Sequence, residues 1–196
     1  MRTVMLLGWV AIATVTACGS SSANNGGGES VDSTDLNSRL IEAAWADDVD
    51  AARDLIEQGA DVNAQDETRQ SAYLIATSEG YVDLLGLTLD NGADVTSLDG
   101  FNGTGLIRAA ERGHHEVVAR LLETDIDVNH VNNLGWTALH EAILLGDGSE
   151  RYVQTVRLLL EHGADPSLPT GEGQDPLVLA ENRGQDAVAE LLRTAR

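Results

Sequence analysis

The tripeptide Gly-Ala-Asp recurs along this chain at a spacing of 33 residues. It begins at Gly59 and again at Gly92, and a degraded copy, Asp-Ile-Asp, begins 33 residues later at Asp125. The next copy begins at Gly163, after five inserted residues. A fixed period of this length indicates a repeat architecture, in which one small supersecondary unit is copied along the chain. The chain is therefore predicted to fold as a row of similar stacked units.

A second landmark keeps the same register, and its clearest copy is the segment WTALHEA at residues 136–142. The threonine position of this landmark holds a helix-capping residue in every copy: Ser38, Ser71, Thr104, Thr137 and Asp175. Five residues later every copy has alanine: Ala43, Ala76, Ala109, Ala142 and Ala180. Each copy thus predicts two closely packed helices, and the glycine of the tripeptide is expected to end the second helix in a left-handed turn. Asp125 occupies that glycine position in the third copy, and we expect strain there.

These motifs resemble the ankyrin-repeat pattern, roughly TPLHxAAxxGHxEVVxLLLxxGADVN. The segments GHHEVV from Gly113 and GADVNA from Gly59 match it closely. The resemblance implies an all-α fold, a solenoid of five stacked helix-turn-helix repeats joined by short β-hairpin loops. It implies a domain over residues 35–196, with repeats at about 35–66, 67–99, 100–132, 133–169 and 170–196. The inserted residues 147–151 are expected to form a longer loop between two helices, or alternatively a second contact point.

Residues 1–17 differ in composition from the repeats. Arg2 is followed by an apolar run from Val4 to Ala13, and small residues precede Cys18. A positive start, an apolar segment and a small-residue cleavage site are typical of a secretory signal peptide. The uncharged stretch from Thr3 to Cys18 is shorter than the roughly 20 residues that a membrane-spanning helix needs. We therefore predict that residues 1–17 are a signal peptide.

The segment Val15-Thr-Ala-Cys18 also resembles the bacterial lipobox, in which the cysteine receives a diacylglyceryl group and the chain is cut before it. Cys18 is the only cysteine and so has no disulfide partner in the chain. Residues 18–34 continue as a Gly/Ser/Asn-rich segment, predicted to be a flexible tether. The resemblance implies a secreted lipoprotein, with Cys18 as the lipidation site carrying palmitate-type chains on the extracytoplasmic face of a bacterial cell membrane. The alternative is an ordinary signal peptide with an incidental cysteine.

The charge balance restricts the classes of partner. The chain holds 32 acidic against 12 basic residues, a formal net charge of −20. Such a charge repels nucleic acid and anionic lipid head groups. We therefore expect a monomer that binds a protein partner with a basic patch and binds no nucleic acid. For most of these charges, a solvated acidic surface is an equally good interpretation.

The resemblance implies that a partner binds to the hairpin tips and to the exposed side of each first helix. Large apolar side chains fall at such positions across the third and fourth repeats, where exposed aromatic anchors are typical of binding sites. The predicted partner-binding residues are Phe101, Leu134, Trp136, Leu144 and Leu145, with Glu111 and Arg112 as a polar rim and Trp45 in the first repeat. Alternatively, Leu134 and Trp136 pack against the neighbouring hairpin.

Motifs for catalysis and cofactor binding are missing from the sequence. It contains no nucleophile elbow, phosphate-binding loop or dinucleotide-binding glycine pattern. His114, His115 and Glu116 are adjacent, and neighbours on a helix diverge by about 100°, so we expect no metal site and no cofactor. His140 falls at the helix-cap histidine position of the family. The predicted function is a non-catalytic protein–protein interaction module; the alternative is an accessory or immunity factor for an exported enzyme or toxin.

Overall fold

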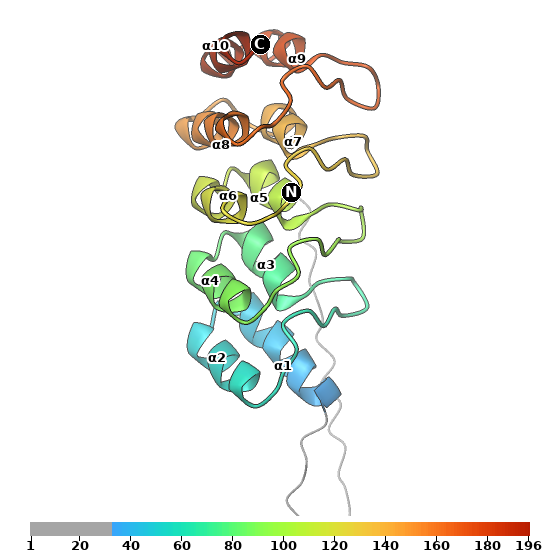
Figure 1. The fold of residues 1–196 in the computed structure, drawn as a ribbon, viewed down its shortest axis with the longest axis vertical. Helices are drawn as coiled ribbons and strands as arrows, with labels where there is room; N and C mark the ends of the chain where they lie inside the picture. Colours follow the sequence, from blue (N-terminus) through green and yellow to red (C-terminus); the bar gives the residue numbers. More distant parts are fainter. Residues whose placement is uncertain (1–32) are drawn as a thin grey trace, which may run out of the picture. The chain divides into compact units, whose positions relative to one another are not determined.

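The computed structural model describes residues 33–196, which fold into paired helices stacked in a column (Figure 1). The ten helices of these residues are α1 (Ser33–Trp45), α2 (Val49–Glu57), α3 (Ala72–Glu79), α4 (Val82–Asp90), α5 (Gly105–Arg112), α6 (His115–Leu122), α7 (Ala138–Leu144), α8 (Glu150–Glu161), α9 (Pro176–Asn182) and α10 (Asp186–Thr194). The odd-numbered helices lie beside the long loops, and the even-numbered helices form the second layer. The predicted all-α solenoid of five repeats is confirmed.

The loops between repeats project to one side and fold back on themselves, although the described residues contain no β-strand (Figure 1). Two backbone bonds close each tip: the amide of Asp99, for example, donates to the Gly103 carbonyl at 3.0 Å, and the amide of Asn102 donates to the Asp99 carbonyl at 3.2 Å. The Asp99 carboxylate also accepts from the amides of Phe101 and Gly103, both at 2.8 Å. Because the arms flanking each tip are too short for a ladder, the predicted β-hairpin loops are tight turns without strand pairing.

The five alanines of the repeat occupy equivalent buried positions. Ala43 is 8 % exposed, and the other four are at most 1 % exposed. In every repeat except the fourth, the alanine carbonyl accepts the amide of the residue five positions later, as in the 3.0 Å bond from His114 to Ala109. This recurring contact confirms the register of the repeats.

The capping prediction is correct for four repeats and wrong for the first. The hydroxyl of Ser71, for example, accepts the amide of Leu74 at 3.2 Å, and Thr104, Thr137 and Asp175 cap in the same way. Ser38 instead lies inside α1, where its hydroxyl donates to the Thr34 carbonyl at 3.0 Å. Because the described part of α1 begins at Ser33, before the expected domain start at residue 35, Ser38 has no free helix end to cap.

The five-residue insertion lengthens both a loop and a helix. The connection between α7 and α8 spans residues 145–149, and α8 has 12 residues where α6 has 8. Glu150 and Arg151 are therefore helical, so the expectation of a simple longer loop over residues 147–151 is only partly correct. The extension seats Tyr152 against the preceding repeat, where its hydroxyl donates to the Glu111 carbonyl at 3.1 Å.

The turn after α6 does not contain the expected strain. Gly59, Gly92 and Gly163 have φ values of 102°, 82° and 91°, whereas Asp125 is not among the residues with positive φ. Instead the amide and hydroxyl of Thr124 both donate to the Leu121 carbonyl, at 3.0 and 2.6 Å. The second helix of the third repeat thus ends with the two Thr124 hydrogen bonds, and Asp125 does not adopt the left-handed conformation.

Asparagine side chains clamp successive repeats together at the same turns. Asn63 donates to the Gly92 carbonyl at 3.0 Å and accepts the Asp94 amide at 2.7 Å. Asn129 makes the equivalent pair of bonds to the next glycine turn, at 3.0 and 2.9 Å. Thr96 occupies this position between the second and third repeats and is too short for both bonds. The missing asparagine therefore coincides with the missing glycine at residue 125.

Replacing Thr96 with Asn and Asp125 with Gly together is expected to restore this clamp. The double variant should be more stable than the wild type by about 1–2 kcal/mol, because two hydrogen bonds of about 0.5–1.5 kcal/mol each outweigh the flexibility of glycine. Asp125→Gly alone should be neutral or destabilising by up to about 1 kcal/mol, because it relieves no strain. Urea unfolding of the wild type, the two single variants Thr96→Asn and Asp125→Gly, and the double variant measures the coupling between the two positions. Strictly additive effects would contradict the shared clamp.

Candidate protein-binding site

A hollow of about 210 Å³ opens between the third and fourth repeats, on the side of the loops. The loops at 99–103 and 132–136 supply two of its walls, and α5 and α7 supply the others. The residues that line it are Asp99, Phe101, Gly103, Ile107, Arg108, Glu111, Asn132, Leu134, Trp136, Glu141 and Leu145. We call this surface the repeat 3–4 hollow. Its walls belong to two different repeats, so it exists only when both are stacked.

Apolar side chains form the rim of the repeat 3–4 hollow. Phe101, Leu134 and Leu145 are 62 %, 53 % and 50 % exposed, and Trp136 is half-buried. A backbone bond joins the two tips: the Asn133 amide donates to the Phe101 carbonyl at 3.0 Å. The hollow therefore brings together four of the five residues of the expected apolar patch, Phe101, Leu134, Trp136 and Leu145.

Glu141 and Asn132 form the polar floor. The Asn132 side-chain oxygen accepts the amides of Leu134 and Trp136, at 2.9 and 3.1 Å. This fixes its amino group toward Glu141, and it donates to Glu141 Oε1 at 2.9 Å. Glu141 is only 4 % exposed, and its second oxygen, Oε2, has no hydrogen-bond partner. The floor thus presents a buried acceptor with spare capacity.

A small ion-pair network flanks this carboxyl group. Arg108 Nη1 lies 2.5 Å from Glu111 Oε2, and Arg108 Nε lies 3.5 Å from Asp99 Oδ2. Asp99 is buried by the loop that it organises, while Arg108 and Glu111 are half-buried. One guanidinium therefore serves two carboxylates and leaves Glu141 without an ion-pair partner of its own.

The surroundings of Glu141 favour its neutral form. Burial raises its pKa from the ordinary 4.5 to about 7, and the nearby charges of Glu111 and Asp99 add to that rise. The hydrogen bond from Asn132 and the charge of Arg108 act in the opposite direction. Glu141 therefore changes protonation state close to neutral pH.

The structure separates the other predicted site residues from the repeat 3–4 hollow. Arg112 pairs with Glu79 of the preceding repeat at 2.8 Å and does not line the hollow. Leu144 is half-buried and packs against the core, because its neighbour Leu145 takes the outward position at the end of α7. Trp45 is 48 % exposed at the end of α1, in the first repeat. Of the eight predicted partner-binding residues, the hollow gathers Phe101, Glu111, Leu134, Trp136 and Leu145.

Cys18 and the segment 1–17 lie outside the described residues. Among the helices of residues 33–196, none combines the length and the apolar character that crossing a membrane requires.

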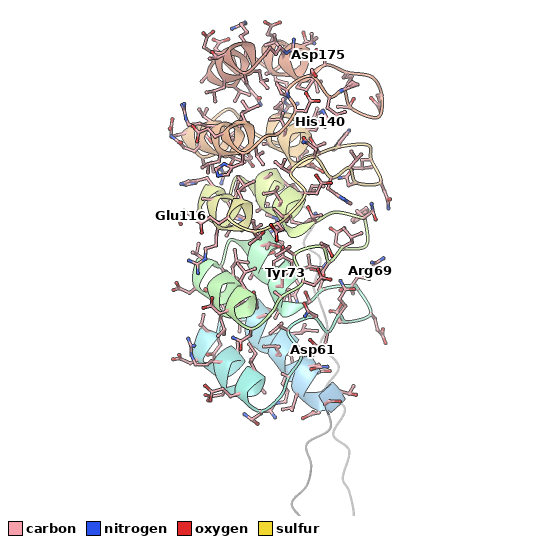
Figure 2. All side chains as sticks on the ribbon, in the orientation of Figure 1. Asp61, Arg69, Tyr73, Glu116, His140 and Asp175 are labelled. Atoms are coloured by element: carbon pink, nitrogen blue, oxygen red, sulfur yellow. The ribbon has the colours of Figure 1, made fainter. Side chains whose placement is uncertain are left out.

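His140 has the structural role expected of the family position. Its Nδ1 accepts the Thr137 amide at 2.9 Å, while the Thr137 hydroxyl accepts the His140 amide at 3.4 Å. The Nε2 atom donates to the carbonyl of Leu168 in the following loop, at 2.9 Å. Figure 2 shows His140 where α7 meets the loop region. The side chain thus caps one repeat and ties it to the next.

Six residues of the hollow were missed at the sequence level: Asp99, Gly103, Ile107, Arg108, Asn132 and Glu141. Asp66, Asp99 and Asn132 do follow one another at the 33-residue spacing, each opening a loop and accepting two of its amides. That spacing was the available signal for Asp99 and Asn132. No comparable pattern marks Arg108 or Glu141.

Family models match most of the described part of the chain. A model described as ankyrin repeats, in three copies, matches residues 73–170, and a single ankyrin repeat matches residues 35–67. Among solved structures, an ankyrin repeat domain from Acinetobacter baumannii AYE is 50 % identical, with a TM-score of 0.77 over 80 % of each chain. A second crystallised ankyrin repeat protein is 35 % identical, with a TM-score of 0.75 over 79 % of this chain and 78 % of the other.

Curated relatives match over a shorter stretch. The ankyrin repeat protein YahD of Escherichia coli (strain K12) is 50 % identical over 62 residues, which are 32 % of this chain and 31 % of YahD. The potassium channel AKT1 of Oryza sativa subsp. indica is 44 % identical over 62 residues, or 32 % of this chain and 6 % of the channel. The matched stretch thus spans about a third of YahD and a small part of the channel.

Glu141→Gln is expected to flatten the dependence of stability on pH. With a pKa of about 7 in the folded state and 4.5 ordinarily, Glu141 stabilises the fold fully below pH 4.5, and this contribution is lost as the pH rises through 7. Between about pH 5.5 and 8, the free energy of unfolding of the wild type should fall by up to about 2 kcal/mol, and that of the variant should not show this fall. Urea unfolding at several pH values measures the difference.

The matched control is Glu116→Gln, because Glu116 is exposed on the edge of α6 away from the loops (Figure 2). Burial lowers the pKa of His114 and His140, so both histidines destabilise the fold as the pH falls below about 6.5. That effect is common to all three proteins and cancels in the comparison. Parallel profiles for the wild type and Glu141→Gln would show that Glu141 is ionised throughout.

Proposed function

Because the chain belongs to the ankyrin-repeat family, whose repeats form protein–protein interaction modules, we propose that it captures a partner protein through the repeat 3–4 hollow. The hollow lies on the loop side of the solenoid and is built from two repeats with rigidly held tips. Its role is to bind and hold the partner, and we assign it no reaction.

One observation carries this proposal. Six large apolar side chains are exposed in the described residues, and three of them, Phe101, Leu134 and Leu145, line this single hollow. Trp136 lies among them. Scattered apolar side chains on a surface need no explanation, but a cluster with aromatic anchors around a depression is typical of a binding site.

We further propose that the chain is a lipoprotein tethered through Cys18 to the outer face of a bacterial cytoplasmic membrane. The support is the charged start, the apolar run and the segment VTAC that ends at Cys18. A diacylated cysteine supplies two acyl chains, which is the number needed for stable anchoring. The proposal would place the binding module outside the cytoplasm, facing exported or envelope proteins.

Trp136→Ala should weaken partner capture at least tenfold while changing thermal stability little. The Trp136 backbone amide and carbonyl hold the loop through Asn132, and both groups remain in the alanine variant. The half-buried indole contributes mainly to the rim. Quantitative cross-linking capture from membranes, with a melting curve for each protein, measures both effects. The control is Val178→Ala in α9, an exposed apolar side chain that does not line the hollow. Full capture by Trp136→Ala would refute the proposed surface.

Cys18→Ser is expected to abolish membrane attachment. Bacteria that express the full chain are fed a fatty-acid analogue, and the label should enter the wild type but not the variant. The wild type should sediment with membranes, whereas the variant should be recovered without them. Label in the Cys18→Ser protein, or an unlabelled wild type, would remove the tether from the account.

A further inference from the structure

We propose that the repeat 3–4 hollow binds a cationic side chain, an arginine or lysine, from a basic segment of the partner protein. Glu141 at the floor would accept its hydrogen bond, and the apolar rim would enclose its aliphatic stem. This inference rests on the proposed function and specifies the chemistry of the partner.

Glu141 has a spare hydrogen-bond acceptor at the floor of the hollow. Its Oε1 accepts from Asn132, whereas Oε2 is buried without a partner in a residue that is 4 % exposed. A buried polar atom without a partner costs about 1–3 kcal/mol. A donor that enters the hollow would remove this penalty. Glu141 can receive such a donor because it lines the hollow.

The charged side chains that line the hollow are mostly acidic. Three carboxylates, those of Asp99, Glu111 and Glu141, face a single cation, Arg108. Arg108 is already engaged by Glu111 at 2.5 Å and by Asp99 at 3.5 Å. With Glu141 ionised, the group has a formal charge of −2. The chemistry missing from the hollow is therefore a positive charge, and an anionic ligand would meet repulsion.

The volume of the hollow and the residues of its rim suit a single long side chain. About 210 Å³ is less than the roughly 300–1,000 Å³ of a typical small-molecule pocket, and it suits one long side chain. Phe101 and Trp136 provide aromatic surface on which a guanidinium or ammonium group can stack. Leu134 and Leu145 offer apolar surface for the methylene stem. An acidic floor below an aromatic rim matches the two ends of such a side chain.

Binding should be coupled to the protonation of Glu141. The groups that face it are Glu111 and Arg108 on α5, Asp99 in the loop before α5, and Asn132 in the next loop. Burial, with a contribution from Glu111, raises the pKa of Glu141 to about 7, and a bound cation would lower it again. Deprotonation would then accompany binding, so affinity should rise from pH 6 to pH 8 by about tenfold.

The test titrates two blocked pentapeptides into the ¹⁵N-labelled full chain. One probe is acetyl-Gly-Leu-Arg-Leu-Gly-amide, and the other replaces arginine with citrulline, which has nearly the same shape and no charge. The arginine peptide should shift the indole signal of Trp136 and the amides of Leu134 and Leu145. It should bind at least tenfold more tightly than the citrulline peptide at pH 8. Because both peptides bind to the wild-type protein, this comparison does not depend on whether a variant folds.

Glu141→Gln should remove both the preference for arginine and the rise in affinity with pH, whereas Glu116→Gln should keep them. Equal binding of the two peptides by the wild type, or a preference retained in Glu141→Gln, would overturn the inference. The proposed function is tested separately. Partner capture that needs Trp136 but not Glu141 would support the proposed partner-binding surface and refute the proposed cation site. If the wild type prefers the arginine peptide but the Trp136→Ala variant still captures the partner fully, the cation site would stand and the proposed partner-binding surface would be refuted.

Discussion

No helix pair of residues 33–196 can bury its own apolar face, and this constraint determines the rest of the structure. Leu106, Leu139 and Leu159 are at most 1 % exposed because neighbouring repeats cover them. The fit between repeats is close: a Cβ atom on Gly105 would lie 2.6 Å from the hydroxyl oxygen of Tyr73 in the preceding repeat. Stability is therefore a sum of contacts between neighbours, and each layer restricts the residues that the next layer can use.

The candidate binding surface is a consequence of the same stacking. Asp99 and Asn132 each order one loop through its backbone amides, and the loops are joined where Asn133 donates to the Phe101 carbonyl. Asn132 also aims its amino group at Glu141. Asn132 thus orders the loop at 132–136 and also supplies a hydrogen-bond donor to the polar floor. The acidic floor and the apolar rim have one structural origin, namely the junction of two repeats.

The 33-residue period was sufficient to predict the architecture, because its glycines and alanines specify turns and close helix contacts locally. The positions of Phe101, Leu134 and Trp136 at the loops followed from the same period. The role of Glu141 could not be predicted, because its hydrogen bond comes from Asn132, nine residues earlier, and its pKa depends on charges in another repeat. The conformation at Asp125 was also mispredicted, because a helix can end in more than one way and Thr124 supplies the alternative. Local patterns indicated the repeat, but only the stacked structure shows how one repeat alters its neighbour.

Each repeat is held in place by its neighbours, and amide hydrogen exchange can measure this dependence helix by helix. We expect the slowest exchange in α5 and α7, which have a repeat on either side, and faster exchange in α1 and α10 at the ends of the stack. Protection in α1 and α10 equal to or greater than that in α5 and α7 would contradict a stack held together by contacts between adjacent repeats.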